Sequence, residues 1–321
     1  MFSGFHCKRR LVLILLAGAP FPAQDPPSIK VEVDLVNVLC SVRDQRGALV
    51  SHLKQEDFIL LEEGKPQVIR HFARETNLPL TVGLLVDTSN SQVHLIEGER
   101  RAAAQFLSQV IRPRDSAFLL SFDARTELLM DRTSSPNAIR RGLEKLQEVS
   151  PQLHRRGGTG RPRGTVLYDA VEEASRMRLG GEPGRKALVL ITDGMDVGSR
   201  LRMDEAIDAA QKADTMIYSI YYVDSKAYGG AEWANRLGQS VLLEMSQQTG
   251  GRFFRVDRKH PLKQIFDQIQ QEMRSQYSLQ FISSDHRKDG LYRRLDVYLR
   301  DPNLKAQARK GYYAPKTDGV E

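Results

Sequence analysis

The chain has 321 residues, of which 40% are hydrophobic and 27% are charged. This is the composition of an ordinary globular protein, and the length allows one large domain or two of moderate size. The formal charge of +7 falls to +4 when residues 1–24, which carry three basic and no acidic side chains, are set aside. That balance is too mild to indicate a nucleic-acid-binding protein, which needs a clustered basic face.

Residues 1–24 have the layout of a secretory signal peptide. Lys8, Arg9 and Arg10 precede a short apolar run, Leu11–Ala19, which small residues and prolines follow. The run is too short to span a bilayer as a helix. We therefore expect a secreted or periplasmic protein with no stable membrane span after cleavage. An N-terminal anchor or a buried helix is the alternative interpretation.

The two cysteines agree with export without proving it. Cleavage after Ala19 or near Gln24 would remove Cys7 and leave Cys40 alone in a strand-like segment. A single cysteine forms neither an internal disulfide nor a cysteine zinc site. Cys40 is therefore expected to be a small buried hydrophobic residue.

Two segments of the chain, 28–76 and 277–316, have the character of β-strands. The first opens with "IKVEVDLVNVLCSVRD", in which apolar and polar positions alternate, and continues with "DFILLEEGKPQVIRHFA", which indicates two strands joined at "EEGKP". The second contains "YSLQFIS", "YRRLDVYLRD" and "AQARKGYYAP". Neither segment has enough strands for a stable sheet alone, so we expect both to form one small β-sandwich.

Between these segments, residues 79–276 alternate apolar strands with helices. The strands "LPLTVGLLV", "SAFLLSFD", "KALVLITD" and "MIYSIYYV" are nearly continuous apolar runs, as in a parallel sheet that helices cover on both faces. "TELLMDRT" follows "SAFLLSFD" after two residues, a link that allows only an antiparallel hairpin. The predicted fold is an α/β domain with a doubly wound, mostly parallel sheet, inserted in the β-sandwich.

Oxygen-bearing side chains gather where the predicted parallel strands end. Asp87 ends the first of these strands and is followed by Ser89 and Ser91 in "DTSNS". Asp193 ends "ALVLITD", and Thr165 begins a helix in "GTVLYDA". Ligands of open α/β sheets bind beyond the carboxyl ends of the strands, and an oxygen-only set favours Mg²⁺, with Ca²⁺ or Mn²⁺ possible. The alternative is that the two serines only cap the next helix.

The motif and its partners resemble the metal-ion-dependent adhesion site (MIDAS) of von Willebrand factor A (VWFA) domains. That pattern is D-x-S-x-S followed by a distant threonine and a distant aspartate, which "DTSNS", "GTVLYDA" and "ITDG" match in order. The resemblance covers about residues 79–258. Thr159 competes with Thr165 for the threonine position, but Thr165 directly precedes a helical pattern. The flanking β segments further resemble a bacterial family of secreted proteins in which this domain lies between β segments.

The resemblance implies roles for the five residues. Asp87, Ser89 and Ser91 would bind the cation directly, Thr165 directly or through water, and Asp193 through water or directly. It also implies that an acidic side chain of a protein partner completes the site. Mg²⁺ rarely occupies a site made entirely by protein, which agrees with a position left for a partner.

The loop "HRRGGTGRPRG" before the threonine is rich in arginine. Arg155, Arg156, Arg161 and Arg163 could form a positive rim that steers acidic partners to the cation. The alternative is a solvated arginine loop without a function. No lysine occupies the Gly-Lys-Ser/Thr position that a phosphate-binding loop requires.

Two other classes of function remain as alternatives. A metal-dependent hydrolase would need a base, and His154 lies near the metal loops in sequence. A structural module of the cell envelope would use its cation only to stiffen the loops. We expect a protein-binding module and not an enzyme.

Overall fold

A computed structural model describes residues 35–74, 78–89, 91–92, 94–155, 164–223 and 232–316. The chain divides into Met1–Val33 and Asp34–Glu321, and every described residue belongs to the second unit. The predicted signal peptide therefore lies outside the described residues.

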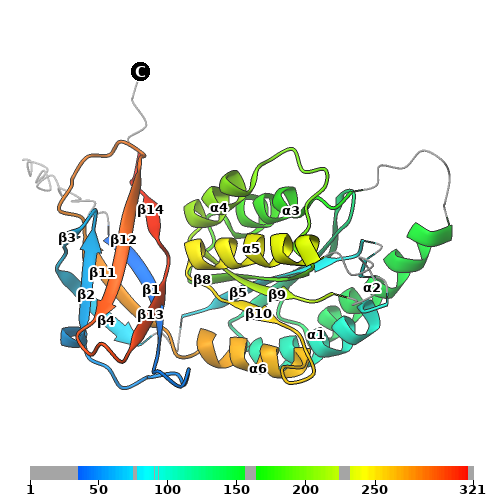
Figure 1. Cartoon of the computed structure of the whole chain (residues 1–321), viewed down its shortest axis with the longest axis horizontal. Helices are drawn as coiled ribbons and strands as arrows, with labels where there is room; N and C mark the ends of the chain where they lie inside the picture. The colour runs from blue at the N-terminus through cyan, green and yellow to red at the C-terminus, as the bar shows by residue number, and fades with distance from the viewer. Residues whose placement is uncertain are drawn as a thin grey trace, which may run out of the picture. The chain divides into compact units, whose positions relative to one another are not determined.

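Strands from both ends of the described chain form two four-stranded antiparallel sheets (Figure 1). Their bounds are β1 Leu35–Arg43, β2 Phe58–Glu62, β3 Lys65–Pro66, β4 Ile69–Arg74, β11 Tyr277–Ile282, β12 Tyr292–Leu299, β13 Lys305–Ala308 and β14 Gly311–Tyr313. One sheet has the order β13-β1-β11-β4 and the other β14-β12-β2-β3. Early and late strands thus pair directly in both sheets, for example Val38 opposite Leu279 and Leu60 opposite Val297.

The two sheets share one hydrophobic core. Val38 and Cys40 of β1 lie in the same buried cluster as Leu60 of β2 and Leu295 of β12, so the inner faces pack against each other. Cys40 is fully buried, as predicted, and burial raises the pKa of its thiol to about 12.

Where two strands joined at "EEGKP" were predicted, the structure has three strands: β2, β3 and β4. Glu63 and Gly64 both have positive φ angles, 48° and 75°, which is the conformation of a tight two-residue hairpin turn. The returning strand β3 ends at Pro66, and one more backbone hydrogen bond to β2 follows it, from the Gln67 N–H to the carbonyl of Leu60 at 2.9 Å. The chain then crosses to the other sheet, where β4 pairs with β11.

The middle of the chain forms a six-stranded sheet with the order β10-β9-β8-β5-β6-β7. Its strands are β5 Leu80–Asp87, β6 Ser116–Phe122, β7 Thr126–Thr133, β8 Arg185–Thr192, β9 Thr215–Tyr221 and β10 Phe253–Arg255. All neighbours are parallel except β6 and β7. The chain runs outward from β5 to β7 on one side and from β8 to β10 on the other. The strand order therefore reverses between β5 and β8.

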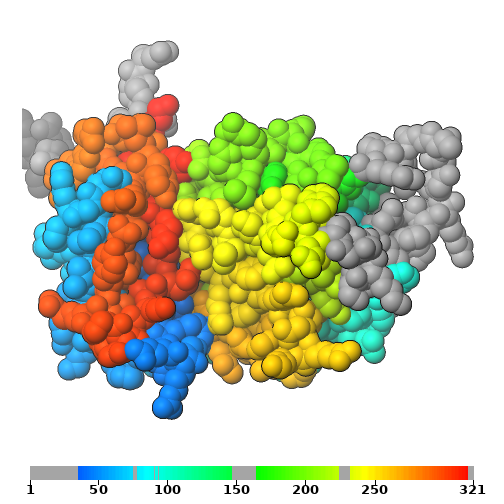
Figure 2. Space-filling view, viewed as in Figure 1, coloured from blue at the N-terminus to red at the C-terminus, as the bar shows by residue number. Residues whose placement is uncertain are grey.

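Helices cover both faces of this sheet (Figure 1). They are α1 Ile96–Val110, α2 Pro136–Arg155 and α6 Leu262–Met273 on one face, and α3 Leu167–Glu173, α4 Met203–Lys212 and α5 Glu232–Thr249 on the other. Successive side chains of β5 pack on opposite faces of the sheet. Leu84 belongs to the core under α1, and Leu85 belongs to the core under α3. Figure 2 shows α4, α5 and α6 at the surface of this part of the molecule.

The predicted fold class is confirmed: a doubly wound, mostly parallel sheet is inserted between the strands of a β-sandwich. The helix boundaries differ in detail. α1 begins at Ile96. The helix after Thr165 has only seven α-helical residues and continues as a π-helical turn, Ala174–Leu179.

Candidate metal site

Asp87 and Asp193 lie on the two sides of the point where the strand order reverses. Asp87 is the last residue of β5, and Asp193 follows the last residue of β8. The strands are parallel neighbours paired up to Val86 and Ile191, so both carboxylates lie at the same edge of the sheet. This is where doubly wound sheets bind ligands.

Asp87 is held in one orientation by the loop residues around it. Its side chain is fully buried. One carboxylate oxygen accepts a hydrogen bond from the Thr192 hydroxyl, with an O···O distance of 2.6 Å. The other accepts the backbone N–H of Ser89 at 2.9 Å. The carboxylate therefore cannot rotate freely, and the turn after β5 folds back over it.

The two serines connect Asp87's loop to Asp193. The Ser91 hydroxyl donates to a carboxylate oxygen of Asp193 at 2.7 Å, and it lies 3.0 Å from the Ser89 hydroxyl. The other oxygen of Asp193 accepts the backbone N–H of Met195 at 3.0 Å. Four of the five predicted site residues thus form one cluster joined by hydrogen bonds.

Thr165 reaches the same edge through its backbone. Its N–H donates to the carbonyl of Val197 at 3.1 Å, and its carbonyl accepts the N–H of Val197 at 2.9 Å. Val197 lies four residues after Asp193, so Thr165 is attached to the loop that carries this carboxylate. Its side chain is nearly buried, with 8% exposed.

The site holds two like charges away from water. Burial, and next the negative charge of Asp193, raises the pKa of the Asp87 carboxyl to about 7; the hydrogen bonds from Ser89 and Thr192 work in the opposite direction. The charge of a neighbouring carboxylate disfavours the ionised form of the buried Asp87. A cation placed among these oxygens would remove that repulsion.

The chemistry of the donor set fits a hard cation. Two carboxylates and three hydroxyls offer oxygen alone, which Mg²⁺ and Ca²⁺ prefer. Among the residues that the structure describes, no group of three or more His, Cys, Asp or Glu side chains could hold a metal ion. A cation here would therefore depend on the serine and threonine hydroxyls as well as on the two carboxylates.

The alternative that the serines serve as helix caps does not describe their contacts. The residue that precedes α1 is Leu95, and no side chain caps this helix. Ser91 donates to Asp193 instead. The hydroxyls therefore serve the cluster and not the helix.

The predicted arginine rim cannot be located. Arg156, Arg161 and Arg163 lie outside the described residues, as does Thr159. Arg155 is the last residue of α2, but its side chain is not described. The rim therefore stays a prediction.

Two polar residues of this region escaped the sequence analysis. Thr192 directly precedes Asp193, and its hydroxyl also accepts the N–H of Gly194 at 3.1 Å. Glu99 lies on the apolar face of α1, fully buried, and neither of its carboxylate oxygens has a partner among the described residues. Burial, and next the charge of Asp87, raises its pKa well above the usual value. The sequence does carry a signal for its burial: Glu99 lies three positions after Ile96, inside the apolar stripe of the helix.

The turn that carries Asp193 is pressed against α5. Gly194 has a φ of 77°, and a Cβ atom added there would lie 2.4 Å from the carbonyl oxygen of Gly238. A Cβ atom on Gly238 would lie 2.0 Å from the carbonyl oxygen of Asp193. Both positions therefore require glycine, and the position of Asp193 depends on this close backbone contact.

Searches of protein-family models and of curated proteins give no match for this chain. Solved structures similar to it include an aerotolerance-related membrane protein from Bacteroides fragilis with multiple mutations to serines, at 19% identity over 60% of this chain and 98% of that chain, with a TM-score of 0.46. Another is the vWF domain of the type V pili tip protein Mfa5 from Porphyromonas gingivalis, at 13% identity over 61% and 95%, with a TM-score of 0.45.

A third similar structure is proximal thread matrix protein 1 from the mussel byssus with a zinc-occupied MIDAS motif. It has 13% identity to this chain, covers 65% of this chain and 48% of that one, and has a TM-score of 0.47. At these identities and TM-scores neither a family nor a function follows from the likeness.

Proposed function

We propose that this chain is an extracytoplasmic protein-binding module of the VWFA type, in which a divalent cation is completed by an acidic side chain of a protein partner. The observation that carries the proposal is the hydrogen bond from Ser91 to Asp193. It joins the loops after β5 and β8 into one oxygen cluster at the point where the strand order reverses.

Asp87, Ser89, Ser91, Thr165 and Asp193 would hold the cation in this proposal. Mg²⁺ suits the set best because it binds through one or two carboxylates and retains exchangeable positions. A bound divalent cation would supply a positive charge to which a partner's carboxylate can bind. The protein's own residues orient that position: Thr192 and the Ser89 N–H fix the Asp87 carboxylate.

Extracytoplasmic location is part of the proposal. It rests on the basic residues and short apolar run in residues 1–24. Within the ranges that the structure describes, no helix is long and apolar enough to cross a membrane.

A structural role for the cation is the second candidate. The raised pKa of Asp87 supports the structural role as much as the partner-binding role. Any cation between Asp87 and Asp193 would stabilise the loops whether or not a partner binds. The two candidates differ in what happens when the cation is removed from an assembled complex.

The first experiment measures cation binding by isothermal titration calorimetry of the purified protein with Mg²⁺, Ca²⁺ and Mn²⁺. Asp87→Ala and Ser91→Ala should each weaken binding by at least about tenfold, because ligand and supporting residues of metal sites typically contribute this much. Ser108→Ala is the matched control, since Ser108 is exposed on α1 and bonds only to a carbonyl of its own helix. Equal affinity in all four proteins would contradict the proposed cation site.

The second experiment captures partners from the envelope proteins of the source organism, in Mg²⁺ and in chelator. The proposal expects a partner that is retained only with Mg²⁺ and that Asp87→Ala does not retain. A partner retained equally in both conditions, by a protein that does bind Mg²⁺, would favour the structural role. Metal-dependent turnover of generic esters that Asp87→Ala abolishes would favour a hydrolase.

A further inference from the structure

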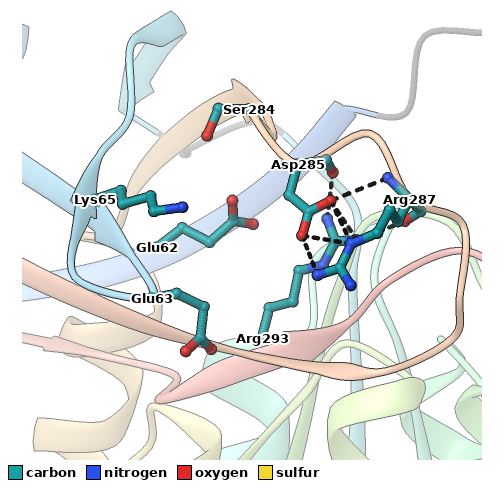
Figure 3. Close-up of a pocket in the computed structure, with 7 residues that line it drawn as sticks. All are labelled: Glu62, Glu63, Lys65, Ser284, Asp285, Arg287 and Arg293. Atoms are coloured by element: carbon teal, nitrogen blue, oxygen red, sulfur yellow. Dashed lines mark hydrogen bonds and ion pairs between the residues drawn. The ribbon is translucent and has the colours of Figure 1, made fainter.

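A polar cavity lies in the β-sandwich. Its volume is about 340 Å³, at the lower end of the range for small-molecule sites. Figure 3 shows side chains that line it pointing in from two walls. One wall is the hairpin of β2 and β3, and the other is the loop between β11 and β12 with the start of β12. The lining residues are Glu62, Glu63, Lys65, Ser284, Asp285, Arg287 and Arg293.

The hairpin wall carries two carboxylates that are not neutralised by an ion pair. Glu62 is 3% exposed, and its oxygens accept the hydroxyls of Tyr312 at 2.6 Å and Ser283 at 2.7 Å. Glu63 is exposed and accepts the backbone N–H of Arg294. Neither carboxylate forms a salt bridge with any described residue. Each retains lone pairs that a ligand's cation could use.

The opposite wall is rigid because Arg293 holds its backbone. Arg293 is 5% exposed; its guanidinium donates to the carbonyls of Asp285, at 2.6 Å, and Arg287. It also donates to the Ser283 hydroxyl at 3.0 Å. This hydroxyl therefore bridges the buried Glu62 carboxylate and the buried guanidinium. The cavity is built before any ligand arrives, which lowers the cost of binding.

The charged side chains at the mouth of the cavity differ in the hydrogen bonds and ion pairs that they already form. Asp285 accepts three hydrogen bonds from the Arg287 side chain, at 2.6 to 3.1 Å, and these bonds hold the pKa of its carboxyl well below the usual range. Arg287 remains largely exposed, with 72% of its side chain accessible. Lys65 is exposed and forms no ion pair within the described part of the chain. Figure 3 shows these two cations on opposite sides of the Glu62 carboxylate.

We propose that this cavity binds a dipolar ligand: an amino acid with a basic side chain and a free carboxylate. Its cationic group would bind Glu62 and Glu63, and its carboxylate would bind Lys65 at the mouth, because Arg287 is already paired with Asp285. The cavity has room for about ten water molecules, which suits one amino acid. The same chemistry occurs at the end of a polypeptide that terminates in arginine or lysine.

This inference is independent of the proposed cation site, because the cavity residues belong to the sandwich and none of them is a predicted cation ligand. Loss of one function would leave the other intact.

The test uses calorimetric titration of the purified protein with three related ligands. L-Arginine should bind saturably. L-Citrulline, which replaces the guanidinium by a neutral group, and agmatine, which lacks the carboxylate, should each bind at least about tenfold more weakly. Added salt should weaken arginine binding, since both contacts are between charges near the surface.

Variants of the cavity residues test the contact of the ligand's cationic group and the contact of its carboxylate separately. Glu63→Gln keeps the acceptor for Arg294 but removes a charge, so it should weaken the binding of both arginine and agmatine about tenfold. Lys65→Gln should weaken arginine binding and leave agmatine binding unchanged. Lys54→Gln and Glu56→Gln are the matched controls, because this exposed pair does not line the cavity. Neither control should change any affinity.

A further pair of ligands distinguishes a free amino acid from the end of a polypeptide. A short peptide ending in arginine with a free carboxylate is compared with the same peptide amidated. Tighter binding of the free-acid peptide than of arginine would assign a polypeptide end, and tighter binding of arginine would assign the free amino acid. The proposal is overturned if neither binds saturably, if citrulline binds as tightly as arginine, or if Glu63→Gln and Lys65→Gln bind as the parent does.

Discussion

Ser91 and Asp193 are 102 positions apart in the sequence and are joined by a hydrogen bond of 2.7 Å. The bond connects two loops that leave neighbouring parallel strands on opposite sides of the place where the strand order reverses. A side-chain contact across this point brings the hydroxyls of one loop to the carboxylate of the other. The proposed cation site depends on this relationship.

The first prediction concerns thermal stability with and without the cation. Excess Mg²⁺ should raise the melting temperature of the parent, because a ligand at 100 times its dissociation constant stabilises the folded state by about 2.7 kcal/mol. Asp87→Ala should abolish that rise while the far-ultraviolet circular dichroism spectrum stays that of the parent. An Asp87→Ala protein that gains as much from Mg²⁺ as the parent would show that the cation binds elsewhere.

Much of the fold could be predicted because hydrophobic patterning is a local property. All eight residues of β5 are buried, and such a run indicates a central parallel strand without knowledge of its neighbours. The alternation in β1 likewise predicted a half-buried strand. The pairing of β4 with β11 in the other sheet could not be predicted, because it joins two segments that lie far apart in the sequence.

The sequence indicated the residue types of the candidate site and the sheet edge where they lie, but not the hydrogen bonds between them. Asp87 and Asp193 end strands, so their shared edge followed from the parallel sheet. The hydrogen bond from Thr192 to Asp87 depends on how β8 is aligned with β5, which one sequence does not reveal. Glu99 is a second example. Helical periodicity places it on the core face of α1 but does not indicate whether a hydrogen-bond partner for its carboxyl lies in the core.

The second prediction is a pH dependence of the cation-free protein. The pKa of Asp87 is raised from 3.8 to about 7, so between these values the folded protein holds a proton that the unfolded chain has released. The free energy of unfolding should therefore fall as the pH rises through this window, by roughly 1 kcal/mol per pH unit from this group, and level off above about pH 7.

The measurement is urea denaturation in chelator at several pH values across that window. Asp87→Asn is the control, because it keeps the shape and removes the titration; its free energy of unfolding should decline less. Saturating Mg²⁺ should remove the decline in the parent, since the cation favours the ionised carboxylate. Parallel curves for parent and variant in chelator would contradict the raised pKa.

The third prediction concerns the buried glutamate on α1. Glu99 is fully buried with both oxygens lacking a described partner, so Glu99→Met should raise the free energy of unfolding of the cation-free protein, by about 1–3 kcal/mol. Glu97→Gln is the control on the same helix, because Glu97 is partly exposed and paired with Arg100; its effect should stay within about 0.5 kcal/mol. A destabilised Glu99→Met protein would reveal a contact that this carboxyl needs.

The last prediction tests whether the backbone of α5 positions Asp193. A Cβ atom on Gly238 would lie 2.0 Å from the carbonyl oxygen of Asp193, and backbone cannot move aside as a flexible side chain can. Gly238→Ala should therefore displace the turn that carries Asp193 and weaken cation binding by about 10- to 100-fold, the usual effect of disturbing the support of a metal ligand. Gly98→Ala is the matched control, since the nearest atom to its added Cβ, the Tyr222 hydroxyl, is 3.8 Å away. This control should bind the cation as the parent does and be slightly more stable, because alanine favours a helix interior over glycine. If Gly238→Ala folded and bound the cation with the parent's affinity, Asp193 would not depend on α5 for its position.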